Sequence, residues 1–177
     1  WCRQNVIRLK TMGGIYTMWP VTDGEKVVSV SVDMGPVRSI RKLEHLTAGW
    51  NEWSGYSVDL GNPHFVIIGE EPDDARLAQD GSALEHNPCF PGRANIEFVG
   101  KEAPNEIRVR VWERGSGITR ACGSGACASF AAVREVGLCA DEVDVILDGG
   151  RLKVALDPET GNLIQTGPAE IVFWGEI

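Results

Sequence analysis

The chain has 177 residues, of which 43% are hydrophobic, and a formal net charge of −8 at pH 7. This length allows one domain or one and a half small ones, with enough apolar residues for a packed core. The acidic balance argues against a nucleic-acid partner, no apolar run approaches the length of a membrane span, and residues 1–10 lack the apolar core of a signal peptide.

Strand patterns dominate the chain, mostly in hairpin-like pairs separated by glycine-rich turns. They cover residues 6–10, 15–19, 26–34, 55–60, 64–68, 93–99, 106–113, 143–147, 151–156, 163–166 and 170–174. Residues 38–53 are polar and lack a clear period, so we predict a connection there. The pairing of the strands predicts an α+β fold with a largely antiparallel sheet.

Two segments have helix patterns. Residues 72–85 begin with proline and acidic residues, as helix N-termini often do. Residues 124–136 are small and apolar, and Gly137 is placed to end this second helix.

The cysteines indicate where the protein works. They are odd in number and match no zinc-ribbon or C-x-x-C spacing: Cys2, Cys89, Cys122, Cys127 and Cys139. Free thiols in a reducing cytoplasm are the simplest interpretation, and we expect no metal site. Because Trp1 cannot be an initiator residue, we also expect a segment upstream of it.

Two short stretches resemble each other and suggest a duplication. Gly13-Gly14 and Gly149-Gly150 each precede a strand, a turn, a second strand and a Gly-Pro pair. Cys122 lies 27 positions before Gly149. A duplicated counterpart of Cys122 would therefore lie 27 positions before Gly13, upstream of Trp1.

The most distinctive stretch is residues 113–127, ERGSGITRACGSGAC, which run from a strand pattern into the second helix pattern. A helix N-terminus carries unpaired N–H groups and a partial positive charge, and this field lowers the pKa of a thiol. We therefore predict a reactive thiolate at Cys122, beside an anion-binding cradle formed by Gly123-Ser124-Gly125. Cys127, five positions later, is predicted to pack inside the protein.

Three chemistries are open to a thiolate at Cys122. It could attack a carbonyl, ligate a metal or remove a proton from carbon. No His/Cys cluster supports a metal. A hydrolase would need a histidine to activate the thiol, and spacing does not choose among His45, His64 and His86.

Other polar residues have both ordinary and functional interpretations. His64 opens a strand after the Asn62-Pro63 turn, where a structural histidine is common. Asn95 lies in a strand pattern that disfavours asparagine, which indicates a polar task. Glu113 and Arg114 could form an exposed ion pair, or they could clamp the ammonium and carboxylate groups of an amino acid.

Taken together, the motifs resemble the diaminopimelate epimerase family in order and spacing over nearly the whole chain. The residues that carry this resemblance are Gly61-Asn62-Pro63-His64, Arg93-Ala94-Asn95-Ile96, residues 113–127, Gly149-Gly150 and Thr166-Gly167-Pro168-Ala169. The 113–127 stretch is highly specific to the family, whereas each of the other motifs is weaker alone.

The resemblance implies two mirrored halves, each with curved, mostly antiparallel sheet around a central helix, and a site in the cleft between them. On this basis residues 1–36 are a remnant of the first half and residues 37–168 form the complete second half. Residues 169–177 form a C-terminal strand that returns to the first half.

The resemblance also implies an activity, the interconversion of LL- and meso-2,6-diaminopimelate in lysine and peptidoglycan-precursor biosynthesis. Two cysteines, one from each half, move protons at the substrate Cα without a cofactor or metal, in a cytoplasmic homodimer. Cys122 would be the catalytic cysteine of the second half, with its pKa tuned by His64 and Glu113. The implied substrate-binding residues are Asn62, Asn95, Glu113, Arg114, Gly123 and Ser124.

The main departure from the family is the first cysteine, which in the family lies in a Cys-Gly-Asn-Gly loop. That motif is absent, and Cys2 lacks the glycines and is too close to Gly13 to be its counterpart. We therefore expect no epimerase turnover from these 177 residues alone. Three alternatives stay open: a related proline or hydroxyproline racemase, a non-catalytic remnant that only binds an amino acid or a partner chain, and a cysteine hydrolase with an acyl-enzyme on Cys122.

Overall fold

The computed structural model describes residues 5–11, 13–170, 172 and 175–176. The strands are β1 (Ile7–Thr11), β2 (Gly14–Asp23), β3 (Lys26–Pro36), β4 (Ser39–Ala48), β5 (Asn51–Asp59), β6 (Pro63–Ile68), β7 (Asn95–Ala103), β8 (Glu106–Glu113), β9 (Gly117–Thr119), β10 (Glu142–Leu147), β11 (Gly150–Leu156) and β12 (Asn162–Pro168). The helices are α1 (Asp74–Glu85) and α2 (Gly123–Glu135). Neither described helix is long and apolar enough to cross a membrane.

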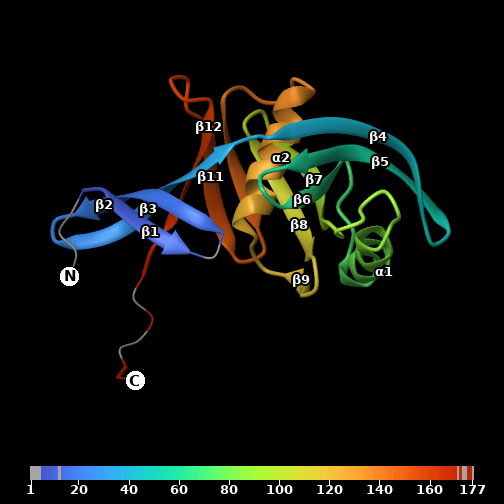
Figure 1. Cartoon of the computed structure of the whole chain (residues 1–177), viewed down its shortest axis with the longest axis horizontal. Coiled ribbons are helices and arrows are strands. Elements are labelled where there is room, and N and C mark those ends of the chain that lie inside the picture. Colours follow the sequence, from blue (N-terminus) through green and yellow to red (C-terminus); the bar gives the residue numbers. More distant parts are fainter. Residues whose placement is uncertain (1–4, 12, 171, 173–174, 177) are drawn as a thin grey trace.

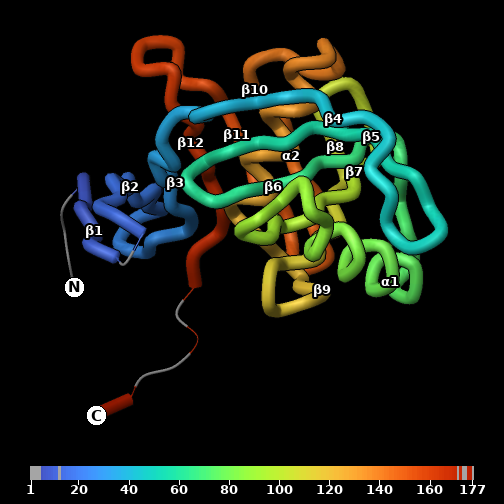
Figure 2. The backbone as a smooth tube through the Cα atoms, turned by 45° about the vertical axis from the view of Figure 1, so that its right-hand side comes forward, coloured from blue at the N-terminus to red at the C-terminus, as the bar shows by residue number. Residues whose placement is uncertain are grey.

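The strands form one curved sheet in the order β1-β2-β3-β12-β11-β10-β8-β7-β6-β5-β4, with β9 paired to β8. Neighbours are antiparallel except for two parallel pairs, β6 with β7 and β8 with β10. Figure 1 shows the sheet curving around α2, with α1 at the lower right and β1–β3 extending to the left. The tube view in Figure 2 shows the same arrangement from another side. The predicted α+β class with mostly antiparallel strands is confirmed.

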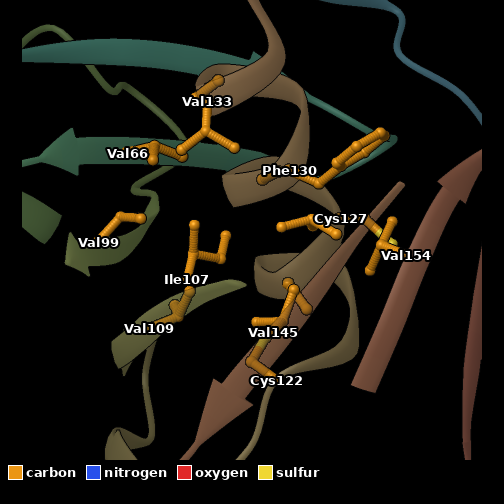
Figure 3. Close-up of a cluster of buried hydrophobic side chains, with 14 of the residues drawn as sticks. Val66, Val99, Ile107, Val109, Cys122, Cys127, Phe130, Val133, Val145 and Val154 are labelled. Carbon is orange, nitrogen blue, oxygen red and sulfur yellow. The ribbon is translucent and has the colours of Figure 1, made fainter. Parts of the chain in front are cut away.

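Two apolar clusters lie on opposite faces of this sheet. One surrounds α2 and includes Val66, Val99 and Phe130 (Figure 3). The other packs with α1 and includes Phe65 and Phe98. Because successive side chains of a strand point to opposite faces, the apolar runs of β6 and β7 supply both clusters. Burial on both faces of the sheet thus explains why the apolar residues of β6 and β7 follow one another without alternating polar residues.

Both helices begin and end as their sequences indicate. Asp73 caps α1, and its carboxylate accepts a hydrogen bond of 2.8 Å from the Arg76 N–H. Cys122 is the N-cap residue of α2, with an extended backbone at φ −141° and ψ 112°. Gly137 follows α2 with φ 72°, the left-handed conformation that glycine adopts without strain.

The connection predicted for residues 38–53 is wrong, because β4 and the start of β5 form a hairpin there. In β4 the apolar residues recur every third position, at Ile40, Leu43 and Leu46, so no period of two is visible. The structure explains this spacing by a bulge between Leu43 and Leu46, where His45 has φ 58°. As an edge strand, β4 also exposes many charged side chains.

Two further differences are smaller. Strand β9 was not predicted, since it is a three-residue pairing inside the glycine-rich stretch before Cys122. The strand predicted at 170–174, and with it the C-terminal unit 169–177, falls largely on Ile171, Phe173, Trp174 and Ile177, which lie outside the described residues.

Candidate active site

Cys122 lies where β9 leads into α2, at the base of the α2 cluster. Its side chain is buried, with 7% of its surface exposed. Its Sγ lies 3.7 Å from the Ser124 hydroxyl. Figure 3 shows Cys122 below Cys127 and next to Val145. The thiol therefore sits between an apolar core and the first turn of a helix.

The prediction of a thiolate with a lowered pKa at Cys122 is wrong, because the pKa of this thiol is raised overall. The pKa of this thiol is raised to about 12, mainly by burial and next by the nearby carboxylate of Glu97. The Gly125 backbone N–H and the Ser124 hydroxyl lower it, but by less, and Glu113 adds a smaller increase. At neutral pH Cys122 thus holds its proton.

Cys127 is fully buried in the α2 cluster, which confirms its predicted packing role. Its Sγ lies 3.7 Å from Oε1 of Gln165 on β12. Burial raises the pKa of this thiol to about 12 as well. Cys127 is therefore a second neutral thiol, positioned inside the core rather than at the helix N-terminus.

A cleft of about 560 Å³ opens between β2–β3 and the N-terminus of α2. Asn62, from the turn between β5 and β6, donates a 3.2 Å hydrogen bond from Nδ2 to the Ser124 hydroxyl. The polar side chains that line the cleft include Tyr16, Asp33, Arg38, Asn62, Ser124 and Asn162. Two of the predicted binding residues, Asn62 and Ser124, are thus brought together at its wall.

Asn95, Glu113 and Arg114 form a second group of predicted site residues. Asn95 Oδ1 accepts a 2.9 Å hydrogen bond from the Arg114 N–H, and Asn95 Nδ2 donates to the Pro63 carbonyl. Glu113 Oε1 accepts a 2.6 Å hydrogen bond from the Thr119 hydroxyl, on β9. The Arg114 guanidinium donates to a backbone carbonyl, and no ion pair joins it to Glu113 in the described part of the chain. The exposed-pair interpretation of Glu113 and Arg114 is therefore not supported.

Glu85, at the end of α1, was missed from the sequence although it fixes the turn after Glu113. Its carboxylate accepts hydrogen bonds from Trp112 Nε1 at 2.7 Å, from Gly115 N at 3.0 Å and from Arg93 Nη1 at 3.1 Å. Burial works to raise the pKa of Glu85, but these donors lower it on balance. The partners come from two other segments, Arg93 before β7 and residues 112–115 at the end of β8, so only the folded chain reveals the role of Glu85.

His64 is fully buried at the start of β6, where its Nδ1 lies 2.7 Å from Oε1 of the equally buried Glu97. Glu97 was also missed, although a lone acid in the apolar run of β7 is a detectable signal. His45 is exposed and pairs with Glu52, and His86 contacts the Ser82 carbonyl. None of these hydrogen bonds joins a histidine to Cys122, so the activated thiol of a hydrolase is not assembled.

The site therefore combines a protonated thiol, a cradle at a helix N-terminus and two groups of hydrogen-bonding side chains. The first turn of α2 offers backbone N–H groups that have no partner within the helix, which suits a carboxylate. Among the residues that the structure describes, no group of three or more His, Cys, Asp or Glu side chains could hold a metal ion. Such an arrangement can bind an amino acid and exchange a proton at a buried sulfur.

Comparison with solved structures defines the class of the fold. It is similar to a probable proline racemase from Agrobacterium radiobacter, with a TM-score of 0.67 and 18% identity, over 94% of this chain and 60% of that one. A hydroxyproline epimerase from Agrobacterium vitis gives a TM-score of 0.65 and 17% identity, over 91% of this chain and 55% of that one. The fold is that of the racemase and epimerase class.

Sequence comparison is more specific. The profile of the family described as diaminopimelate epimerase matches residues 56–172. The diaminopimelate epimerase of Parabacteroides distasonis is 43% identical over 176 residues, which cover 99% of this chain and 65% of that protein. That of Bacteroides thetaiotaomicron is 41% identical over 172 residues, covering 97% of this chain and 63% of that protein. The chain belongs to the diaminopimelate epimerase family, and it spans slightly less than two thirds of the length of these relatives.

Proposed function

We propose that the whole protein to which this chain belongs is a diaminopimelate epimerase, which interconverts LL- and meso-2,6-diaminopimelate for lysine and peptidoglycan-precursor biosynthesis. The observation that carries the proposal is the buried Cys122 thiol at the N-terminus of α2, next to the Gly123-Ser124 cradle. Membership of the family supports the same activity.

The proposed reaction is a proton exchange between two sulfur atoms through the substrate. A thiolate on one side takes the proton from the Cα–H bond, and the bonding electron pair stays on Cα. Cys122, on the other side, gives the proton of its S–H to the opposite face and becomes a thiolate. The roles reverse for the opposite direction. The second thiol is assigned to the first half of the whole protein, outside these residues.

Because a Cα–H is a very weak acid, the site has to exclude water and supply fixed dipoles. In this proposal the N–H groups of Gly123 and Ser124 hold the α-carboxylate of the reacting centre, and Asn62 orients the Ser124 hydroxyl. Asn95, Glu113 and Arg114 would bind the distal amino-acid end of the substrate. His64 and Glu113 would tune the cysteines, and no cofactor or metal enters the reaction.

We also retain the proposed division of the chain into a first-half remnant at residues 1–36, a second half at residues 37–168 and a returning segment at residues 169–177. Its support is that β1–β3 carry large hydrophobic side chains that stay exposed, such as Ile15 at 59% and Leu9 at 48%. A homodimer in the cytoplasm completes the proposal. The free thiols of Cys89, Cys122, Cys127 and Cys139 favour a reducing compartment.

The decisive experiment follows the substrate α-hydrogen. The purified whole protein, incubated with LL-diaminopimelate in D2O, is expected to invert the centre and to incorporate one deuterium, as measured by chiral chromatography and mass spectrometry. Cys122→Ala should reduce turnover by about 10³-fold or more, since it removes one acid–base group. Cys89→Ala makes the same change at an exposed cysteine and should leave turnover unchanged.

Three results would count against the proposal. One is turnover in Cys122→Ala within tenfold of the unaltered protein, and another is full turnover by the 177-residue chain alone. The third is inversion of proline or hydroxyproline in place of diaminopimelate, which would assign the protein to the racemases that its fold resembles.

A further inference from the structure

A buried pair of ionisable side chains lies on the side of the sheet that faces α2. His64 on β6 and Glu97 on β7 are both 0% exposed, and His64 Nδ1 lies 2.7 Å from Glu97 Oε1. The other polar atom of each group, His64 Nε2 and Glu97 Oε2, is buried without a hydrogen-bond partner among the described residues. Buried polar atoms are nearly always paired, so two unpaired atoms on one pair of residues require an explanation.

Gly125, in the first turn of α2, brings this pair next to the cysteine. A Cβ atom at Gly125 would lie 2.8 Å from Glu97 Oε1 and 3.3 Å from both Cβ and Sγ of Cys122. The Glu97 carboxylate and the Cys122 side chain thus both border the space that a Cβ at position 125 would occupy, so glycine is the residue that fits there. The close approach is therefore built into the backbone of α2.

The ionisable groups that shift the pKa of Cys122 lie on β7 and β8. Glu97 contributes from β7 and Glu113 from β8, and both raise the pKa of the thiol, with Glu97 the larger of the two. His64, on β6, acts through its hydrogen bond to Glu97. Cys127, on α2 itself, is a neutral thiol at physiological pH, because burial raises its pKa to about 12. Glu97, which is hydrogen-bonded to His64, is therefore the carboxylate with the larger effect on the pKa of Cys122.

We propose that Glu97 is a positioning residue of the active site, which holds the His64 imidazole through Nδ1 and keeps Cys122 protonated in the resting protein. As a carboxylate beside Gly125, it repels a thiolate and so favours the S–H form. Cys122 is then ready to act as the proton donor in the direction in which the other thiol is the base. The catalytic meaning of this role rests on the proposed function, whereas the protonation of the thiol does not.

The test compares two glutamate-to-glutamine variants of the whole protein. Glu97→Gln removes the buried charge while preserving size, and Glu102→Gln makes the same change at an exposed position near the end of β7. Alkylation of Cys122 by iodoacetamide is followed from pH 7 to pH 9.5, with the labelled sulfur identified by tandem mass spectrometry. Loss of a neighbouring charge should move the rate–pH profile down by about one pH unit, which is about tenfold faster alkylation at a given pH.

Glu102→Gln should follow the profile of the unaltered protein, and Cys127 should stay unreactive in all three proteins. If Cys122 in Glu97→Gln is alkylated no more than twofold faster than in the unaltered protein, the proposal is overturned. Equal acceleration at Cys127 would overturn it too, because the change would then reflect a loosened core.

A second measurement needs no variant. In the unaltered protein, ¹⁵N chemical shifts of the His64 ring should show a protonated Nδ1, as expected for an imidazole that donates to a carboxylate. A bare Nδ1 with the proton on Nε2 would contradict the proposal. Alkylation and imidazole shifts do not depend on turnover, so they decide the role of Glu97 even if the protein proves not to be an epimerase.

Turnover adds a third readout if the proposed function holds. Glu97→Gln should lower kcat by about tenfold while KM for diaminopimelate changes less than twofold, because Glu97 acts on the thiol and not on the substrate. A rise in KM with kcat unchanged would place Glu97 in substrate binding and would refute its assignment as a positioning residue.

Discussion

Strands β5–β8 and strands β1–β3 belong to one sheet, yet they bury their side chains to very different extents. In the first group Val58, Phe65 and Val66 are 0% exposed, since α2 packs on one face and α1 on the other. In the second group Val27 and Val28 are 37% and 38% exposed, although their sequence is equally apolar. Strand propensity is therefore the same in both regions, and the packing of helices makes the difference.

The comparison implies that strands β5–β8 and the two helices packed on them contribute most of the folding free energy. Strands β1–β3 depend mainly on strand pairing. Backbone hydrogen bonds contribute modestly in net terms, whereas burial of large side chains contributes several kcal/mol each. Changes of similar chemistry should consequently have unequal effects in the two regions.

The largest effect is expected at the centre of the α2 cluster. Phe130→Ala removes a fully buried ring and should lower the free energy of unfolding by about 3–5 kcal/mol, measured by denaturant titration. Val28→Ala, on β3, also truncates an apolar side chain and should cost less than about 1 kcal/mol. Similar losses for the two variants would remove the basis of the comparison.

An intermediate effect concerns pH, because the folded-state pKa values of Cys122 and Cys127 are raised to about 12 from an ordinary value of 9.0. Folding then favours the protonated thiols. Their contribution is fully present below pH 9 and is lost as the pH rises toward 12. Each thiol should give a slope of about −1.4 kcal/mol per pH unit in this window.

Comparing the pH dependence of the unfolding free energy between the unaltered protein and single cysteine variants separates the contribution of one thiol from those of other groups that titrate at high pH. Cys122→Ala should flatten the fall in unfolding free energy between pH 9 and pH 10.5 by about 1.4 kcal/mol per unit. Cys89→Ala, at an exposed site, should leave the slope as it was. An unchanged slope in Cys122→Ala would show that the thiol is not shifted.

The smallest effect is expected in β3. Val27→Thr keeps the shape of the side chain at a 37% exposed position and should change stability by less than about 0.5 kcal/mol. The same replacement at the fully buried Val66 should cost about 1–3 kcal/mol, because its hydroxyl would enter the core. Equal effects at Val27 and Val66 would mean that β1–β3 are as tightly packed as β5–β8.

Much of the fold could be predicted because local signals agree with the packing. Helix α2 has small apolar residues and a following glycine, and strands β6–β8 are apolar enough to require burial. Strand β4 could not be recognised, since its bulge at Leu43–Leu46 replaces the alternation of a regular strand. The spacing of the apolar residues in β4 depends on how β4 pairs with β5, and this pairing is visible only in the structure.

The candidate site shows the same limit. Cys122, Ser124 and Asn62 follow from motifs, and the structure brings these three together. The direction of the Cys122 pKa shift could not be predicted, because the helix N-terminus is a local signal whereas burial and Glu97 come from distant segments. Glu85 was missed for the same reason, since two of its three donors, Trp112 and Gly115, lie 27 and 30 positions away in the chain.

The pairing of β3 with β12 has a consequence for synthesis of the protein. A hydrogen bond of 2.8 Å joins the hydroxyls of Ser31 and Thr166, which are 135 positions apart. At roughly 5–20 residues per second, a ribosome needs on the order of 10 s to make the intervening chain. During that interval β3 has β2 on one edge and an open edge on the other, and its neighbours display apolar side chains. The nascent chain is therefore most exposed to aggregation, and most in need of a chaperone, before β12 is made.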